Sequence, residues 1–235
     1  MTVSRETLDA LATRHGLPAG AAERFERLLE ALEAEPDPPT TVRGGVDAVD
    51  RHLADSLTGL EVEALAAADR IADLGAGAGF PGLALAVALP DTDVDLIEST
   101  ERKCEVIARL ARAADAPNAR AIPERAEDWA AGEGAAAYAA VTARALAPLA
   151  VIAEYAAPLL REGGVLVAWK GSRDEDEEQR GAAAAEELGL DTEGVIRVEP
   201  FEGAANRHLH VYSKRGPTPE GIPRRPGMAR KRPLG

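Results

Sequence analysis

The sequence predicts an α/β domain with a mostly parallel β-sheet, preceded by a helical segment. From Arg70 onward, short apolar segments alternate with longer segments of helical spacing, which is typical of βαβ units. A glycine-rich loop directly follows the first of these apolar segments. The residues before Arg70 have helical spacing and no strand pattern. At 235 residues, the chain has the length of one domain with an appendage.

Residues 1–66 are expected to form an N-terminal helical extension. Ser4 is a suitable N-cap for a first helix, and Pro18 suits the start of a second one. The stretch from Glu35 to Gly45 is rich in Pro and Gly and therefore ends the second helix. A third helix is expected to place four apolar residues on one face: Val46, Val49, Leu53 and Leu57.

Residues 67–214 are expected to form the α/β domain around a seven-stranded sheet. Five strands are predicted at Arg70–Leu74, Asp93–Ile97, Ala119–Ile122, Tyr138–Thr142 and Val165–Trp169. Two further segments, Gly194–Val198 and Leu209–Ser213, are expected to form a closing hairpin. Residues 215–235 are rich in Pro, Gly and Arg, and this composition predicts an extended, irregular basic tail.

The charge of the chain is unevenly distributed. The formal net charge is −13, but residues 207–235 carry eight Lys or Arg and one acid, so the tail is positive and the body strongly negative. An acidic body argues against promiscuous nucleic-acid binding and leaves room for a small basic site. No apolar run approaches the length of a membrane span, so a soluble cytoplasmic protein is expected.

Cysteine and histidine usage excludes several classes of site. The single cysteine, Cys104, cannot form an internal disulfide or a cysteine-rich zinc site, and we expect it to be a packed helix residue. The four histidines are scattered without a close pair of acids, so no metal site is expected.

The glycine-rich loop, DLGAGAGFPG from Asp73 to Gly82, lies between a predicted strand and an apolar helix. Glycine permits positive φ and lets a ligand lie against bare backbone. Dinucleotide-binding loops need the spacing G-x-G-x-x-G, but here Gly79 comes one residue early and Phe80 occupies the expected position. The pattern D-x-G-x-G-x-G instead resembles the first motif of the class I S-adenosylmethionine-dependent methyltransferases, which have a Rossmann-like fold. The resemblance assigns Asp73, Gly75, Gly77 and Gly79 to the cofactor loop.

A second acidic position agrees with this interpretation. Glu98 ends the second predicted strand, 23 residues after Gly75, where a carboxylate can accept protons from both ribose hydroxyls. Three alternatives stay open: a tight turn without a ligand, a surface acid at Glu98, and binding of NAD or FAD.

An ordered set of motifs, from about Thr40 to the end, resembles the RsmG (GidB) family, bacterial methyltransferases that modify N7 of a guanine in small-subunit ribosomal RNA. The motifs are RHLADS at Arg51, DLGAGAGFPG, Glu98-Ser99 followed by Arg102-Lys103, RAED at Arg125, TARA at Thr142, WKG at Trp169, RHL at Arg207, and the ending PRRPG with KRPL. Two departures are Pro38-Pro39-Thr40, where the family usually has Asn-Leu-Thr, and Arg102-Lys103, where it usually has Lys-Arg.

The resemblance implies S-adenosyl-L-methionine as the cofactor and 16S ribosomal RNA, or the small ribosomal subunit, as the partner. It places Gly75 and Phe80 in the loop, Glu98 at the ribose, Ala126 and Glu127 at the adenine, and Arg144 near the methionine end. It leaves open whether naked RNA or an assembled subunit is the substrate. We expect a monomer, although the sequence does not determine the oligomeric state.

RNA contacts on an acidic body must come from concentrated positive charge. The candidate substrate-binding residues are His52, Arg102, Lys103, Arg144, Lys170, Arg207, His208, Arg224 and Arg225. His52 and Asp55 share one helix face, so they either lie at the substrate edge or form an Asp–His bond that fixes the extension to the domain. The tail either binds RNA or serves only to keep the protein soluble.

No catalytic acid or base is expected, because guanine N7 already has an in-plane lone pair and loses no proton when it attacks a methyl group. Orientation of the reacting atoms is then the main contribution of the enzyme. Two other functions stay open: methylation of another RNA, a protein or a small molecule, and a non-catalytic cofactor-binding module associated with the ribosome.

Overall fold

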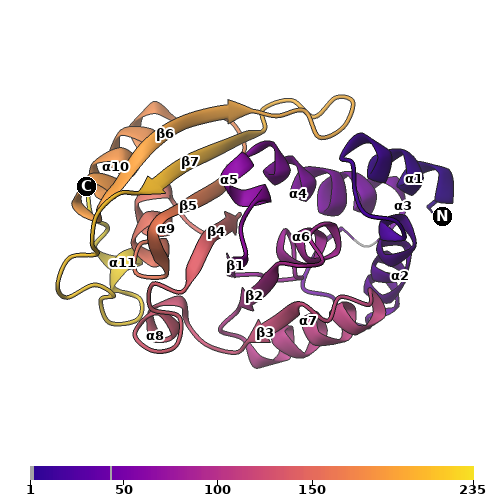
Figure 1. Ribbon diagram of the computed structural model, residues 1–235, viewed down its shortest axis with the longest axis horizontal. Coiled ribbons are helices and arrows are strands. Elements are labelled where there is room, and N and C mark those ends of the chain that lie inside the picture. Colours follow the sequence, from indigo (N-terminus) through magenta and orange to yellow (C-terminus); the bar gives the residue numbers. More distant parts are fainter. Residues whose placement is uncertain (1–2, 43) are drawn as a thin grey trace.

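A seven-stranded sheet with the strand order β3-β2-β1-β4-β5-β7-β6 forms the centre of the protein (Figure 1). The computed structural model describes residues 3–42 and 44–235, whereas residues 1–2 and 43, which belong to the expected extension, lie outside the described part. The strands are β1 (Arg70–Leu74), β2 (Asp93–Ile97), β3 (Ala119–Ile122), β4 (Tyr138–Arg144), β5 (Leu160–Lys170), β6 (Leu190–Arg197) and β7 (His208–Lys214). Strands β1 to β5 pair in parallel, and β7 runs antiparallel to both β5 and β6.

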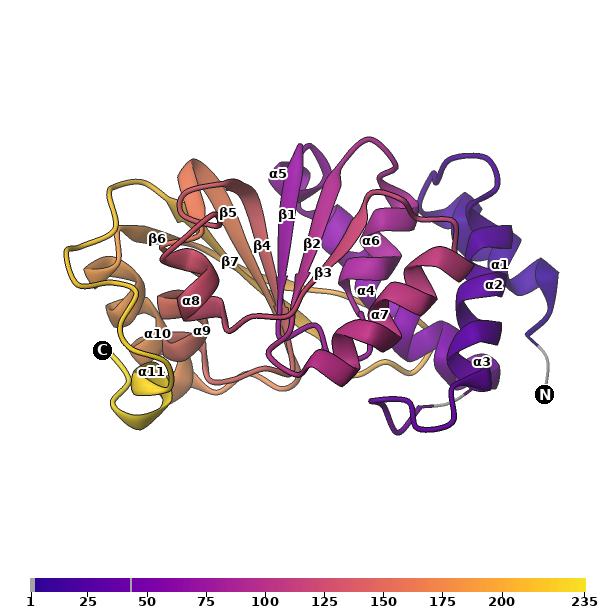
Figure 2. The ribbon, with the colours of Figure 1, turned by 90° about the horizontal axis from the view of Figure 1, so that it is seen from below.

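Helices cover both faces of this sheet (Figure 2). Those of the extension are α1 (Arg5–Arg14), α2 (Ala21–Ala34), α3 (Gly45–Ala48), a π-helical turn η1 (Val49–Ala54), α4 (Asp55–Leu57), a 3₁₀ turn η2 (Thr58–Glu61) and α5 (Glu63–Ala66). The rest are α6 (Gly82–Ala88), α7 (Glu101–Ala113), α8 (Ala126–Ala130), α9 (Leu149–Ala156), α10 (Glu175–Glu187) and α11 (Met228–Lys231). The core divides accordingly into one cluster with α1, α2, α6 and α7 and another with α8, α9 and α10.

The predicted strands and the closing hairpin are confirmed, and the first three strands have the predicted bounds. The main difference is β5, which begins at Leu160 instead of Val165. Gly163-Gly164 lies inside β5 beside a register irregularity in the pairing with β4. Gly163 has a φ of 79°, which glycine adopts without the steric cost other residues meet, so the strand continues through the irregularity.

The third predicted helix is wrong in one respect. The chain forms α3, η1 and α4 in succession instead of a single regular helix. A π turn inserts one extra residue into a helix, so the apolar face before the turn is rotated relative to the apolar face after it. Val49, Leu53 and Leu57 are therefore buried, whereas Val46 is 55% exposed.

The extension packs directly on the α/β domain. Phe25, Leu28 and Leu32 of α2 are fully buried, and α2 contacts both α6 and α7. Burying such side chains contributes about 1.5–3 kcal/mol each. The Arg109 guanidinium on α7 adds a two-point contact to the Glu35 carboxylate, with N–O distances of 2.7 and 2.9 Å.

The C-terminal tail is folded, contrary to the expectation of an extended segment. It contains α11, in which Ala229 is only 1% exposed. Arg224 of the tail pairs through two nitrogens with the carboxylate of Glu154 on α9, which is 3% exposed. The buried acid on α9 and the apolar side chain in α11 explain why this Arg- and Pro-rich segment packs instead of extending.

Within residues 3–42 and 44–235, no helix is long and apolar enough to cross a membrane. The same part of the chain holds no cluster of three or more His, Cys, Asp or Glu side chains that suits a metal ion.

A buried polar network joins β2 to β4 on the side of α8. The Tyr138 hydroxyl donates to Asp95, at 2.8 Å, and accepts the indole N–H of Trp129, at 2.7 Å. Arg70 and Arg120 both donate to the same carboxylate. Burial raises the pKa of Tyr138, and the adjacent Asp95 carboxylate raises it further. The phenol therefore stays protonated and able to donate.

We expect Tyr138→Phe to destabilise the protein by about 1–3 kcal/mol, because the substitution leaves the buried Trp129 N–H without its acceptor and removes one donor from Asp95. Urea unfolding followed by tryptophan fluorescence measures the change. Val46→Ala, at an exposed position, is the control and should stay within about 0.5 kcal/mol of wild type. Equal stability of Tyr138→Phe and wild type would contradict this account of the network.

Candidate functional site at the carboxyl ends of the strands

The loop between β1 and α6 is held by a buried carboxylate. Asp73, the fourth residue of β1, accepts the Gly82 backbone N–H at 2.9 Å and the Thr142 hydroxyl of β4 at 2.8 Å. Its side chain is fully buried, and desolvation raises its pKa to about 6, against which the two hydrogen bonds act. Asp73 therefore fixes the start of α6 to the adjacent strands.

The loop glycines occupy positions that other residues would strain. Gly75, Gly77 and Gly79 all have positive φ, as the motif predicts. A Cβ atom on Gly75 would approach Leu146 to 2.5 Å, and one on Gly79 would approach Leu83 to 2.4 Å. The Gly75 N–H also donates to the carbonyl of Ile97, the last residue of β2. The loop thus packs closely against the end of the second strand.

Glu98 lies beside this loop, immediately after β2. One carboxylate oxygen accepts the Gly77 N–H at 3.2 Å, and the other accepts the Thr100 N–H at 2.9 Å. The ammonium of Lys103 lies 3.6 Å from the first oxygen. The side chain is 6% exposed, so these contacts orient a buried acid at the edge of a cavity.

A first cavity of about 460 Å³ opens at this edge of the sheet. Its walls include four of the nine predicted cofactor residues, namely Gly75, Glu98, Ala126 and Glu127. Ser99, Thr100, Lys103, Leu146, Tyr155 and Arg230 complete much of the remaining wall. Polar groups thus surround the cavity at the ends of β1, β2 and β3.

A second cavity of about 320 Å³ lies next to the first. Ala145 lines both cavities and has a φ of 53°, a conformation that non-glycine residues seldom adopt. Of its two neighbours, Arg144 lines the second cavity and Leu146 the first. The turn after β4 therefore separates the two spaces, and Ala145 is where they meet.

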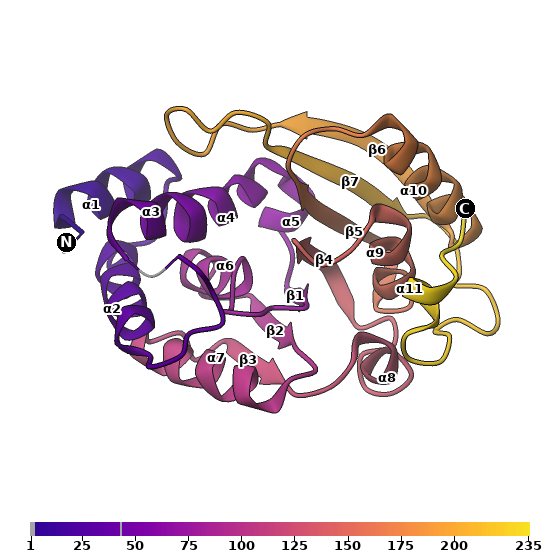
Figure 3. The same ribbon diagram turned by 180° about the vertical axis from the view of Figure 1, so that it is seen from behind.

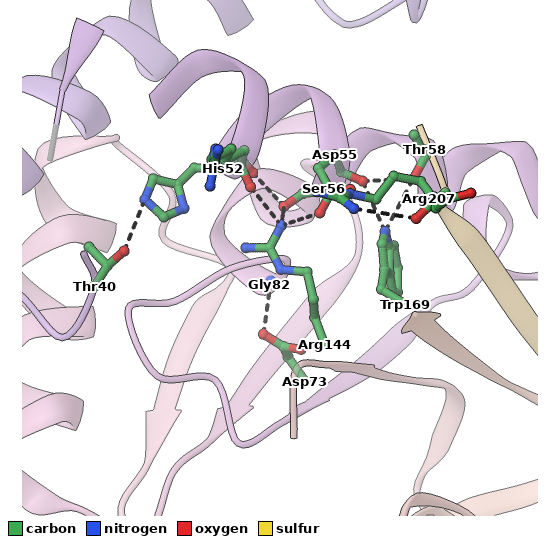
Figure 4. Close-up of polar contacts among 12 residues, drawn as sticks. Thr40, His52, Asp55, Ser56, Thr58, Asp73, Gly82, Arg144, Trp169 and Arg207 are labelled. Carbon is green, nitrogen blue, oxygen red and sulfur yellow. Dashed lines mark hydrogen bonds and ion pairs between the residues drawn. The ribbon is translucent and has the colours of Figure 1, made fainter. Parts of the chain in front are cut away.

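Among the described residues, four cations line the second cavity: Arg51, Arg144, Lys170 and Arg207. Arg144 reaches up from the end of β4 to the extension, where it donates to Asp55 and to the Arg51 carbonyl, at 2.8 and 2.9 Å (Figure 4). The second oxygen of Asp55 has no hydrogen-bond partner within the described part of the chain, and the Arg207 guanidinium lies 3.6 Å from it. The extension and the sheet thus build this cavity together.

Comparisons with known proteins identify the family. The family description "GidB: rRNA small subunit methyltransferase G" matches residues 40–208. The protein named ribosomal RNA small subunit methyltransferase G from Pelotomaculum thermopropionicum is 40% identical over 197 residues, covering 83% of this chain and 82% of the relative. The protein of the same name from Deinococcus radiodurans is 39% identical and covers 90% of this chain and 85% of the relative. The chain belongs to the rRNA small subunit methyltransferase G family.

Solved structures agree with this family at the level of the fold. A cofactor-bound protein from MTB has a TM-score of 0.57 and 20% identity, and the match covers 82% of this chain and 90% of the other. A predicted O-methyltransferase from Agrobacterium tumefaciens has a TM-score of 0.52 and 27% identity, with coverage of 70% and 80%. The Rossmann-like class I methyltransferase fold is therefore confirmed.

Some of the residues that were predicted to bind the cofactor do not line the first cavity. Asp73, Gly77 and Gly79 shape the loop without lining the space. Phe80 is buried and stacks on His52, with ring centroids 4.4 Å apart, and Arg144 lines the second cavity.

The predicted substrate residues divide between several places. Arg144, Lys170 and Arg207 line the second cavity, whereas Lys103 lines the first one and faces Glu98. Arg102 pairs with Asp37 of the extension, and the His208 ring contacts the Gly171 carbonyl at 2.7 Å. Arg224 is engaged with buried Glu154, and Arg225 lies on the exposed surface of the tail. The structure thus brings together only three of the nine candidates in one cavity.

The expected Asp–His bond between His52 and Asp55 does not form. His52 donates from Nε2 to the Val42 carbonyl at 3.1 Å, and its Nδ1 is buried without a partner among the described residues. Asp55 instead binds Arg144. An arginine on the neighbouring strand offers the carboxylate a charged donor, and Phe80 stacks on the imidazole.

Several lining residues, among them Arg51 of the second cavity, were not predicted as site residues, and others were given another role. Leu146 and Tyr155 carry no motif, and Phe201 of the β6–β7 loop lines the second cavity. Arg230 was grouped with the basic tail, but it lines the first cavity. No local pattern marks these side chains, because they enter the site from distant parts of the chain.

His52 is expected to make stability depend on pH. Burial lowers its pKa to about 4 from an ordinary value of 6.5, so the folded state binds fewer protons than the unfolded state between these values. Stability from this group is present above pH 6.5 and is lost as the pH falls toward 4, by up to about 3 kcal/mol.

Urea unfolding from pH 7 to pH 4.5 measures this effect by comparing wild type with His52→Gln, whose amide retains a donor for Val42. The variant should lose less stability than wild type over that range. Parallel curves for the two proteins would show that His52 does not titrate as proposed.

Proposed function

We propose that this chain transfers a methyl group from S-adenosyl-L-methionine to N7 of a guanine in 16S ribosomal RNA of the small subunit. The observation that carries the proposal is the pair of cavities that meet at Ala145, one polar with a buried acid and the other rich in cations. The family membership supports this assignment of a donor site beside an RNA site. Such a substrate would place the activity in the cytoplasm.

The first cavity fits S-adenosylmethionine. Glu98 presents a buried carboxylate that can accept hydrogen bonds from two ribose hydroxyls, and the Gly77 and Thr100 amides set its orientation. Ala126 and Glu127, at the start of α8, are assigned to the adenine. The bare backbone of Gly75 leaves room for the ligand to lie against the loop.

The second cavity fits a phosphate-bearing nucleotide. Arg51, Arg144 and Arg207 present planar guanidinium groups, which suit two-point contacts with phosphate, and Lys170 adds a further positive charge. On a chain with a net charge of −13, this concentration of cations is where RNA is expected to bind. Phe201 offers an aromatic ring to a base in the same space.

The chemistry requires orientation and no general base. S-Adenosylmethionine supplies an electrophilic methyl carbon on a sulfonium. The guanine N7 lone pair forms a new N–C bond while the C–S bond breaks and its electron pair returns to sulfur. No proton leaves the base, so the role of the protein is to hold nucleophile, methyl carbon and sulfur in line, an effect that can supply roughly 7–11 kcal/mol.

The direct test is transfer of a labelled methyl group from S-adenosylmethionine to 16S RNA, and to intact small subunits, that lack the modification. Mapping of the labelled base is expected to find a single N7-methylguanine. Label in another RNA, a protein or a small molecule would assign a different substrate. Absence of transfer, despite demonstrated cofactor binding, would favour a non-catalytic module.

Arg207→Ala is expected to separate RNA binding from cofactor binding. Loss of one phosphate contact should lower the rate at subsaturating RNA by about tenfold and reduce the salt dependence of RNA binding, while S-adenosylhomocysteine affinity stays unchanged. The matched control is Arg197→Ala on β6, where the arginine is exposed and pairs with Glu199. Equal effects of the two substitutions would remove Arg207 from the RNA site.

A further inference from the structure

The last part of the chain, residues 223–235, lies against α8 and α9 beside the first cavity. Figure 3 shows α11 between these helices and the C-terminus, and α11 contacts α9. We call residues 223–235 the C-terminal segment. Three polar contacts attach the C-terminal segment to the domain. Each of them is made to a residue that lines the first cavity or to a helix that borders it.

The first contact is the ion pair of Arg224 with Glu154. Glu154 is almost fully buried on α9, and Arg224 approaches both of its oxygens. The same guanidinium donates to the Arg232 carbonyl at 2.8 Å, which draws the segment into a turn. The next residue of α9, Tyr155, lines the first cavity. This ion pair therefore fixes the segment beside one wall of the cavity.

The second contact involves Glu127 itself. The Gly227 backbone N–H donates to one oxygen of the Glu127 carboxylate at 2.8 Å. Glu127 is 8% exposed and lines the first cavity at the start of α8. The segment thus orients a side chain that the proposed function assigns to the adenine.

The third contact places a cation at the cavity. Arg230 of α11 lines the first cavity and donates to the Leu146 carbonyl at 2.9 Å. Leu146 also lines the cavity, directly after the turn at Ala145. This hydrogen bond fixes one guanidinium nitrogen to the backbone of the cavity wall, while the Arg230 side chain as a whole stays exposed to solvent.

We propose that the C-terminal segment is a wall of the cofactor site and that Arg230 binds the adenosine end of the cofactor. This inference rests on the proposed function, which assigns the first cavity to S-adenosylmethionine. A guanidinium is planar and cationic, so it attracts the face of an aromatic ring and donates to ring nitrogens. Gly227, three residues before Arg230, donates to Glu127, which the proposed function assigns to the adenine, so we assign Arg230 to the adenosine end of the cavity.

The inference changes the role of the basic tail. Arg224 and Arg230 serve the cofactor site through contacts with Glu154 and Leu146. Lys231, which is exposed like Arg230, is adjacent on the same short helix but does not line the first cavity. Arg230 and Lys231 therefore provide a matched pair of positions for substitution.

Calorimetric titration with S-adenosylhomocysteine tests the proposal. Arg230→Ala is expected to weaken binding by about tenfold, the size of one partly desolvated cation–π or hydrogen-bond contact, whereas Lys231→Ala should bind as wild type does. Urea midpoints of both variants check the fold. If Arg230→Ala lowers the midpoint, Arg230→Lys keeps a cation without the planar fork and should still bind more weakly than wild type. Wild-type affinity in the folded Arg230 variants would overturn the proposal.

A second ligand locates the contact. 5′-Methylthioadenosine contains the adenosine end and lacks the amino-acid end, so Arg230→Ala should weaken both ligands by the same factor. A loss confined to S-adenosylhomocysteine would place Arg230 at the amino-acid end and contradict the assignment. Unchanged affinity for both ligands together with weaker RNA binding would make the segment an RNA surface. Failure of wild type to bind either ligand would instead reject the proposed function.

Discussion

The buried carboxylate of Asp73 is the contact on which the geometry of the site depends. It accepts the Gly82 amide, where α6 begins, and the Thr142 hydroxyl of β4. A Cβ on Gly82 would come within 2.9 Å of this carboxylate, so the close approach requires glycine there. Because these hydrogen bonds fix both ends of the glycine loop, the loop can present bare backbone to the first cavity. Arg144, at the end of β4, and Ala145, directly after it, lie where the two cavities meet.

Pairing of charges lets an acidic protein hold a cationic cavity. Asp55 lies between Arg144 and Arg207, and Lys170 pairs with Glu177 at 2.6 Å. These acids keep the cations in fixed positions and lower the cost of holding like charges close together. Since Asp55 belongs to the extension and Arg144 to β4, the ion pair also couples the position of the extension to the substrate cavity. The helical extension is therefore part of the proposed RNA site.

The composition of the tail is compatible both with an extended segment and with a segment that packs on the domain. Its arginines and prolines predict an extended, irregular basic segment, yet Arg224 pairs with a buried acid and α11 packs on α9. Burial of Glu154 is costly without a partner, and the arginine supplies one from about seventy residues away along the chain. No pattern within the tail indicates this partner, because the acid lies on a helix that is otherwise apolar.

The sequence alone determined the strands, the glycine loop and the acid at the end of β2, because each depends on residue spacing over a few positions. It also indicated which cations were candidates. Only the tertiary structure decided which of them meet, why His52 stacks on Phe80 instead of binding Asp55, and where the tail lies. Those outcomes depend on contacts between segments far apart in the chain. Local residue spacing is compatible with several partners for each side chain, and burial and the partners that are within reach decide which contact forms.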